Sequence, residues 1–164
     1  MKESIMQLLE TWFGNSHALV VLIGSAIPIT EMRATIPAGI LVWGLNPWLV
    51  MLLGFVGALL PVPFLLLFFS SVLKWLHRFP ALSKLTQFID NKIQKNVHHF
   101  EKSSEAALIL FVAIPLPGTG LWTGSAVASF LGFKFWRSFT CVAAGGALSA
   151  IVLTIVSVFF STIL

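Results

Sequence analysis

Charged side chains are scarce in this sequence. Only 10% of its 164 residues are Asp, Glu, Lys or Arg, whereas 57% are hydrophobic. Average soluble domains carry roughly 25% charged residues. The shortage excludes an ordinary soluble domain and predicts an integral membrane protein. Because a charge at membrane depth costs free energy, any ionisable residue inside an apolar stretch is a candidate functional residue.

Cysteine is nearly absent, and linker-type sequence is missing. The single Cys141 cannot form an internal disulfide, and we interpret it as a packing residue. No Gly/Ser-rich or Pro-rich linker divides the chain, so residues 1–164 are predicted to form one membrane domain. Segment 1–15 lacks the basic start and cleavable apolar core of a signal peptide. Its spacing predicts an amphipathic interfacial helix, with a frayed terminus as the alternative.

The positive charge is concentrated in one segment. The chain carries a net charge of +4, and six of its ten Lys and Arg residues lie in 74–102. Apolar residues recur there at steps of three and four, which predicts a surface helix with one apolar and one basic face. Such a helix suits an anionic membrane rather than nucleic acid. Adjacent His98 and His99 would point about 100° apart without a completing ligand set, so no metal site is predicted.

The first long apolar stretch, 17–45, is too long for one straight span. Its 28 positions from 17 to 44 would measure about 42 Å as a helix, against a hydrocarbon core of about 30 Å. Two half-helices, at 17–26 and 35–44, would each reach about 15 Å and meet at a tip between Pro28 and Pro37. This pattern predicts a re-entrant helical hairpin, followed by a transmembrane helix at 46–73.

A second stretch repeats this layout. Segment 104–132 is broken by Pro115 and Pro117, and 135–164 can form another span. The motif Ala-Ile-Pro recurs at a spacing of 87, and three further residues recur at a spacing of 88: Gly44, Trp48 and Gly57 match Gly132, Trp136 and Gly145. A hairpin plus one span crosses the membrane once, so the second copy would be inverted. The predicted fold is therefore all-α, an inverted repeat of re-entrant hairpin plus transmembrane helix.

The distribution of bases predicts the orientation. In this layout segment 74–102 lies on the same side as Lys134 and Arg137, and all are basic. Because bases favour the cytoplasmic side, we expect a multi-pass protein of the bacterial inner membrane with segment 74–102 in the cytoplasm.

The first hairpin contains one acid and one base, Glu31 and Arg33. Two positions apart, they would point to opposite sides of a regular helix, but a broken tip lets them pair. Protonating Glu31 at pH 7 costs about 3.7 kcal/mol from an unperturbed pKa of about 4.3, similar to the roughly 2.5–3.5 kcal/mol for inserting a charge. Glu31 is therefore predicted to couple protons, with Arg33 binding an anionic group or acting as its counter-ion. The alternative is an ion pair that closes the hairpin.

The second tip has backbone amides and hydroxyls in place of charge. Its Gly-rich turn can point amide groups at an anion. We predict substrate contacts from residues of this tip and of the following span, with a simple turn as the alternative: Gly118, Thr119, Gly120, Trp122 and Arg137. The same reasoning makes Pro28, Pro37, Pro115 and Pro117 the helix breakers of the two tips. No catalytic residue set is visible, so neither enzyme activity nor a cofactor is predicted.

Two motifs carry a family resemblance. They are Glu31-Met32-Arg33 with Pro37, and Ala113-Ile114-Pro115-Leu116-Pro117-Gly118-Thr119-Gly120 with Trp122-Thr123-Gly124. With them the chain resembles the bacterial small multidrug export protein family, which implies drug export. More distantly it is similar to the DedA or VTT membrane proteins, which implies movement of phosphate-bearing lipids with proton coupling. Those proteins commonly carry an arginine pair in the second hairpin, so here the resemblance would leave phosphate to Arg33, Arg137 and backbone amides.

The resulting hypothesis is a small polytopic transporter or flippase, coupled to protons. Its substrate would be amphipathic, either a phosphate-bearing lipid or a hydrophobic drug-like molecule. One alternative is a non-transporting scaffold or assembly factor, and another is a channel. The expected partners are membrane lipids, the substrate and protons, and the Gly- and Ala-rich contacts permit a homo-oligomer.

Overall fold

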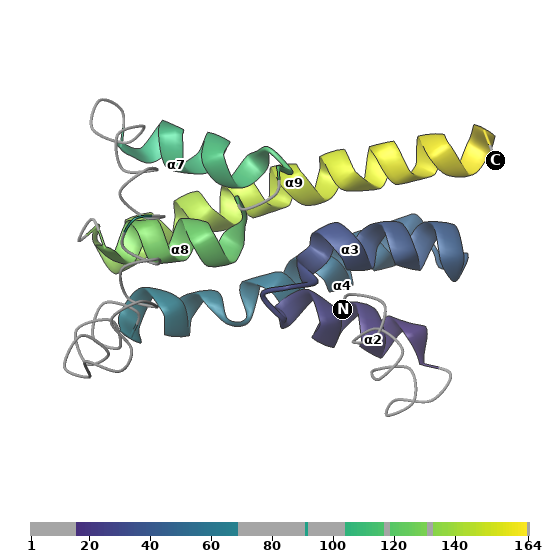
Figure 1. The fold of residues 1–164 in the computed structure, drawn as a ribbon, viewed down its shortest axis with the longest axis horizontal. Coiled ribbons are helices and arrows are strands. Elements are labelled where there is room, and N and C mark those ends of the chain that lie inside the picture. The colour runs from purple at the N-terminus through teal and green to yellow at the C-terminus, as the bar shows by residue number, and fades with distance from the viewer. Residues whose placement is uncertain (1–15, 69–90, 92–103, 117–118, 131–132, 164) are drawn as a thin grey trace. The chain divides into compact units, whose positions relative to one another are not determined.

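The described part of the chain is mostly helical (Figure 1). The computed structural model describes residues 16–68, 91, 104–116, 119–130 and 133–163, and these contain no strand. The all-α class is confirmed for them. The predicted interfacial helix at 1–15 and most of the basic segment 74–102, including His98 and His99, lie outside the described residues.

Two helices are long and apolar enough to cross a membrane. They are Pro47–Phe68, with 22 residues, and α9 (Phe135–Ile163), with 29 residues. At 1.5 Å per residue they measure about 33 and 44 Å, compared with a hydrocarbon core of about 30 Å. They lie within the predicted spans at 46–73 and 135–164, of which 69–73 and 164 lie outside the described residues. The first is interrupted after α4 (Pro47–Leu59), because Pro61 has no N–H to donate, and helix resumes at 62–68.

The chain divides into two compact units. The first comprises Met1–Pro61 with Gly146–Leu164. It contains α2 (His17–Ala26), α3 (Glu31–Pro37), the π-helix η1 (Ala38–Val42) and α4. The helices α2, α3 and α4 all contact one another. Their shared core consists of fully buried apolar side chains, among them Val20, Val21, Met32, Ile36 and Val50.

The second unit is Val62–Gly145. It contains the helix at 62–68, α7 (Ser104–Ala113), α8 (Leu121–Phe130) and the first part of α9. Helix α7 packs on α8, and the Ser129 hydroxyl donates to the Leu66 carbonyl across 3.3 Å. The core is again apolar, with Leu108, Val112, Leu121, Val127 and Val142 fully buried.

A glycine at equivalent positions lets each unit pack closely. A Cβ added to Gly57 would collide with the Leu22 carbonyl oxygen, and one added to Gly145 would lie 2.6 Å from the Ile109 carbonyl oxygen. Leu22 and Ile109 are separated by 87 positions, the spacing of the repeated Ala-Ile-Pro motif. This equivalence supports the predicted repeat. Its inversion across a membrane, and the re-entry of the hairpins, remain predictions.

The first hairpin breaks over fewer residues than predicted. Helix α2 ends at Ala26 as expected, but its partner α3 begins at Glu31 rather than Thr35, so only residues 27–30 are non-helical. The prediction of Pro37 as a tip residue is wrong, because Pro37 lies inside the helix. It cannot donate to a preceding carbonyl, and the chain continues helically by widening into η1, where the Trp43 N–H donates to the Ala38 carbonyl across 3.1 Å.

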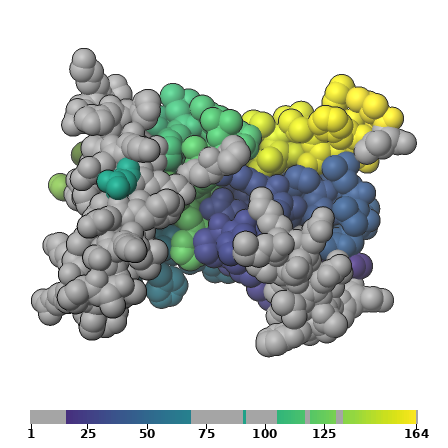
Figure 2. All heavy atoms as spheres, in the orientation of Figure 1, coloured from purple at the N-terminus to yellow at the C-terminus, as the bar shows by residue number. Residues whose placement is uncertain are grey.

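The polarity of the surface is that of a membrane-associated protein. Large apolar side chains are exposed along the spans, including Leu52, Phe64, Ile155 and Phe159, and the C-terminal turns of α9 are visible in Figure 2. Four serine and threonine side chains of α9 are buried instead: Ser138, Ser149, Thr154 and Ser157. Exposing this much apolar surface to water costs free energy, whereas contact with lipid does not.

Candidate functional site

The candidate site is the helix break at 27–30. Ile27 is extended, with φ −82° and ψ 133°, because the following Pro28 disfavours helical backbone at the residue before it. The Glu31 N–H then donates to the Ile27 carbonyl across 2.9 Å. Helix α2 therefore ends and α3 begins within four residues, which places Glu31 at the first turn of α3.

Glu31 has an unusual backbone and a buried side chain. Its φ of 42° is the one positive value among the described residues other than glycine, and the residue is 6% exposed. A left-handed conformation costs a side-chain-bearing residue about 1–2 kcal/mol. Such backbone strain is concentrated at functional sites. The carboxylate is also favoured by its place at the N-terminal end of a helix dipole.

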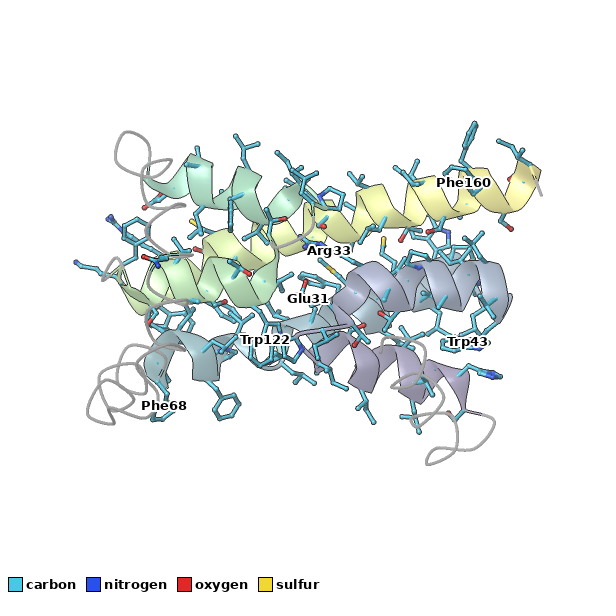
Figure 3. All side chains as sticks on the ribbon, viewed as in Figure 1. Glu31, Arg33, Trp43, Phe68, Trp122 and Phe160 are labelled. Carbon is cyan, nitrogen blue, oxygen red and sulfur yellow. The ribbon has the colours of Figure 1, made fainter. Side chains whose placement is uncertain are left out.

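Arg33 lies beside this acid. Its Nη1 atom is 4.0 Å from Oε2 of Glu31, and the two side chains are 17% and 8% exposed. Figure 3 shows both at the end of α3 nearest the break, whereas Trp43 lies at the far end of the hairpin. The pairing that the sequence left open as one of two arrangements at a broken tip is present here in a helical turn. In a regular helix, side chains two positions apart point to opposite sides. The left-handed backbone of Glu31 departs from that geometry, so its side chain can lie beside Arg33.

Three hydroxyl groups connect the two arms around the break. The oxygens of Ser25 and Thr35 are 2.5 Å apart. Ser25 is also 2.6 Å from the Val21 carbonyl oxygen, and Thr35 is 3.1 Å from that of Glu31. The Thr30 hydroxyl donates to the carbonyl of Gly24. Sequence reasoning missed these residues, although their hydroxyls are the only ones between positions 17 and 44.

The second break is a compact turn. The Thr119 hydroxyl lies 2.8 Å from the Ile114 carbonyl oxygen and 2.9 Å from that of Leu116, so it satisfies turn carbonyls. Gly120 has φ 136°, which glycine adopts readily, and its carbonyl accepts the first helical bond of α8 from Gly124.

The remaining residues predicted for this tip are distributed as follows. Trp122 lies in the first turn of α8 and is half-buried. Pro115 stands in the turn after α7, and Pro117 and Gly118 lie outside the described residues. These positions fit a predicted tip at the junction of α7 and α8.

Arg137 is not brought to this turn. It lies in the first turn of α9 with its side chain 69% exposed, and its Nη1 is 3.6 Å from Oε1 of Glu105. Glu105 begins α7, whereas Thr119 bonds to residues just beyond the end of α7. The two ends are separated by the helix length, about 13 Å. Within the second unit, Arg137 and Thr119 therefore do not form one binding site.

Metal ligation has no candidate in the described ranges. No group of three His, Cys, Asp or Glu residues gathers among residues 16–68, 91, 104–116, 119–130 and 133–163. The chemistry available at the first break is therefore ionic and hydroxylic: one acid, one guanidinium and three hydroxyls.

Comparison with known proteins gives one match. The model of a family described as "Putative small multi-drug export protein" matches residues 31–152. The matched region starts at Glu31 and includes α3, α4, α7, α8 and more than half of α9. No curated protein and no solved structure matches the chain.

Proposed function

Since the family model covers most of its length, this chain belongs to the small multi-drug export family, and we propose that it is a proton-coupled transporter of an amphipathic molecule. Glu31 would bind and release the coupling proton, and Arg33 would hold the balancing charge. The family and the exposed apolar helices support the transporter class, and the geometry at the first break supports the residue roles.

The observation that carries the proposal is the buried Glu31 beside Arg33 at a helix break. Glu31 is 6% exposed, and in an apolar surrounding the free-energy cost of burying a charge competes with the cost of protonating the carboxylate. A nearby guanidinium that moves, or that engages another anion, changes the balance between them. Coupled transport requires an acid of this kind, one that binds its proton in one conformation and releases it in another.

The substrate would be hydrophobic with a polar end. The family description favours a drug-like molecule, and the resemblance to DedA or VTT proteins favours a phosphate-bearing lipid. Trp122 and the Gly120 amide are retained as predicted substrate contacts. We place the protein in the bacterial inner membrane, with segment 74–102 and the Lys134 and Arg137 turn in the cytoplasm.

Transport into proteoliposomes under a pH gradient tests the assignment. Two probes represent the two substrate chemistries, a fluorescent hydrophobic cation and a polyprenyl phosphate. We expect the wild-type protein to accumulate one of them and Glu31→Gln to lose proton-driven accumulation. Glu105→Gln is the matched control, because Glu105 is an exposed carboxylate in the second unit.

Three results would contradict the proposal. Full proton-driven uptake by Glu31→Gln would remove the mechanism. Ion conductance that does not saturate would indicate a channel. Absence of transport by the wild type, together with a cellular phenotype that survives neutral variants at Glu31 and Arg33, would indicate a scaffold.

A further inference from the structure

A pair of hydroxyl groups ties the two arms of the first hairpin beside Glu31. Ser25 belongs to α2 and Thr35 to α3, both are fully buried, and their oxygens are 2.5 Å apart. Thr35 lies one helical turn after Glu31 and reaches its carbonyl oxygen at 3.1 Å. The acid's own backbone is therefore within the hydrogen-bond network of this pair.

Three oxygen contacts in this network share two hydroxyl protons, because Ser25 and Thr35 carry one O–H each. If Ser25 donates to the Val21 carbonyl, then Thr35 donates to Ser25. The Glu31 carbonyl then has no bond from Thr35. If Thr35 donates to Glu31 instead, Ser25 donates to Thr35 and the Val21 carbonyl loses its hydroxyl donor. The hydroxyl pair therefore has two hydrogen-bond arrangements. In one of them the Thr35 hydroxyl donates to the backbone carbonyl of Glu31.

Packing alone does not require the Ser25 hydroxyl. At the spacing of 87 that relates the two breaks, Ser25 corresponds to Val112. Val112 is fully buried and fills the space next to Gly124 and Gly145. Valine therefore performs the packing role of Ser25 in the hairpin without an acid, and the serine hydroxyl at this position occurs in the hairpin that carries Glu31.

Close packing of α4 holds Ser25 in place. A Cβ on Gly57 would come within 3.0 Å of the Ser25 Cβ, so the backbone of α4 passes directly over this residue. The positive φ of Glu31 needs such support, since a residue in a strained conformation persists only when its surroundings fix it.

We propose that Ser25 and Thr35 are positioning residues for the proton-coupling acid. Their hydroxyl pair holds the left-handed turn at Glu31 and so keeps its carboxylate beside Arg33, and its change of arrangement releases that turn during transport. This inference rests on the proposed function, since it assigns a role to residues that act through Glu31.

Transport kinetics of Thr35 variants test the inference. Thr35→Val keeps the shape but removes the hydroxyl, and Thr35→Ser restores the hydroxyl. We expect Thr35→Val to lower the maximal proton-driven rate by about tenfold to a hundredfold, with a smaller change in KM, and Thr35→Ser to transport at close to the wild-type rate. The matched control is Thr123→Val, which alters the corresponding threonine of the second hairpin at the spacing of 88.

A double variant separates positioning from general damage. The readout is substrate exchange without a pH gradient, which does not require the coupling proton. If Thr35 acts through Glu31, then Thr35→Val lowers this exchange no further in a Glu31→Gln protein than Glu31→Gln does alone. Should Thr35→Val fail to fold, as judged by size exclusion in detergent, Ser25→Ala replaces it with the same expectation. Ser25→Ala leaves Thr35 a single partner, the Glu31 carbonyl, and removes the link between the arms.

The outcomes distinguish the two proposals. Glu31→Gln with full transport defeats the proposed function itself. If Glu31→Gln loses transport but the folded hydroxyl variant works at the wild-type rate, the positioning role is overturned while the function stands. An equal loss in Thr35→Ser, or an additive loss in the double variant, also overturns the positioning role.

Discussion

The two helix breaks of this chain share a backbone plan but differ in chemistry. Each follows a helix of ten residues, α2 or α7, and each is succeeded by a span whose glycine packs on a carbonyl of that helix. The first break contains Glu31, Arg33 and three hydroxyls, whereas the second uses Thr119 and Gly120 in a turn. The close glycine packing thus occurs in both hairpins, whereas only the first break contains ionisable groups.

The opposite ends of the hairpins differ as well. His17 at the start of α2 stacks on Trp43 after η1, with ring centroids 5.0 Å apart. At the start of α7, Glu105 instead pairs with Arg137 of α9. The first hairpin is therefore closed on itself by an aromatic contact, and the second is joined to the following span by an exposed ion pair.

The shared plan is tested most severely at the two glycines. Gly57→Ala forces a methyl group into the Leu22 carbonyl, and Gly145→Ala brings one to 2.6 Å from that of Ile109. We expect a loss of about 3 kcal/mol or more for Gly57→Ala and about 1–3 kcal/mol for Gly145→Ala, although alanine favours helix. Thermal unfolding in detergent measures both, with the exposed Val56→Ala as control. Unchanged melting temperatures would show that the glycine contacts do not stabilise the packing within each unit.

The chemical difference is tested by neutralising the charges of the first break. Glu31→Gln removes the negative charge of this partly buried pair, and Arg33→Gln removes the positive charge. Each single variant is expected to lose about 3 kcal/mol, and the double variant to recover most of it. Transport should stay absent in the double variant, because no acid remains to carry a proton. If the double variant recovered both stability and transport, the ion pair would have only the structural role of closing the hairpin.

Where proline and length dominate, the sequence is sufficient to predict the helix end and the two apolar helices. The end of α2 at Ala26 follows from Pro28, since the residue before a proline avoids helical backbone. The two spans follow from apolar runs long enough to cross a bilayer. The acid and base at the first break were predicted to pair or to face apart, and the structure shows the pair.

The details of the break depend on tertiary contacts. Pro37 lacks an N–H and is expected at a helix break, yet the helix continues by widening into the π-helix η1. Nothing in the local sequence predicts this widening. Glu31 adopts a positive φ, although residues other than glycine favour negative φ. The Ser25 and Thr35 contact joins residues ten positions apart, and it forms because α2 and α3 pack on each other and both pack on α4. Arg137 was grouped with the second tip because its charge suits phosphate, but an exposed partner at the start of α7 was equally compatible.

The smallest expected effects concern the opposite ends of the hairpins, where the two kinds of closure respond differently to salt. His17→Ala removes a stacked pair worth about 0.5–1.5 kcal/mol, which is insensitive to ionic strength while the histidine is neutral. Glu105→Ala removes an exposed ion pair worth less than about 1 kcal/mol, and about 1 M salt should abolish its effect on the melting temperature.

Thermal unfolding of both variants in detergent at low and high salt makes the comparison, with Ser104→Ala as a neighbouring control. A salt-dependent loss in His17→Ala would mean that the histidine contributes as a cation, held over the ring of Trp43. A loss in Glu105→Ala that persists at high salt would mean that the pair with Arg137 is less accessible to ions than its exposure implies. In either case the His17 end and the Glu105 end would respond to salt more similarly than their stacking and ion-pair geometries indicate. The difference between the two hairpins would then lie in the helix breaks alone.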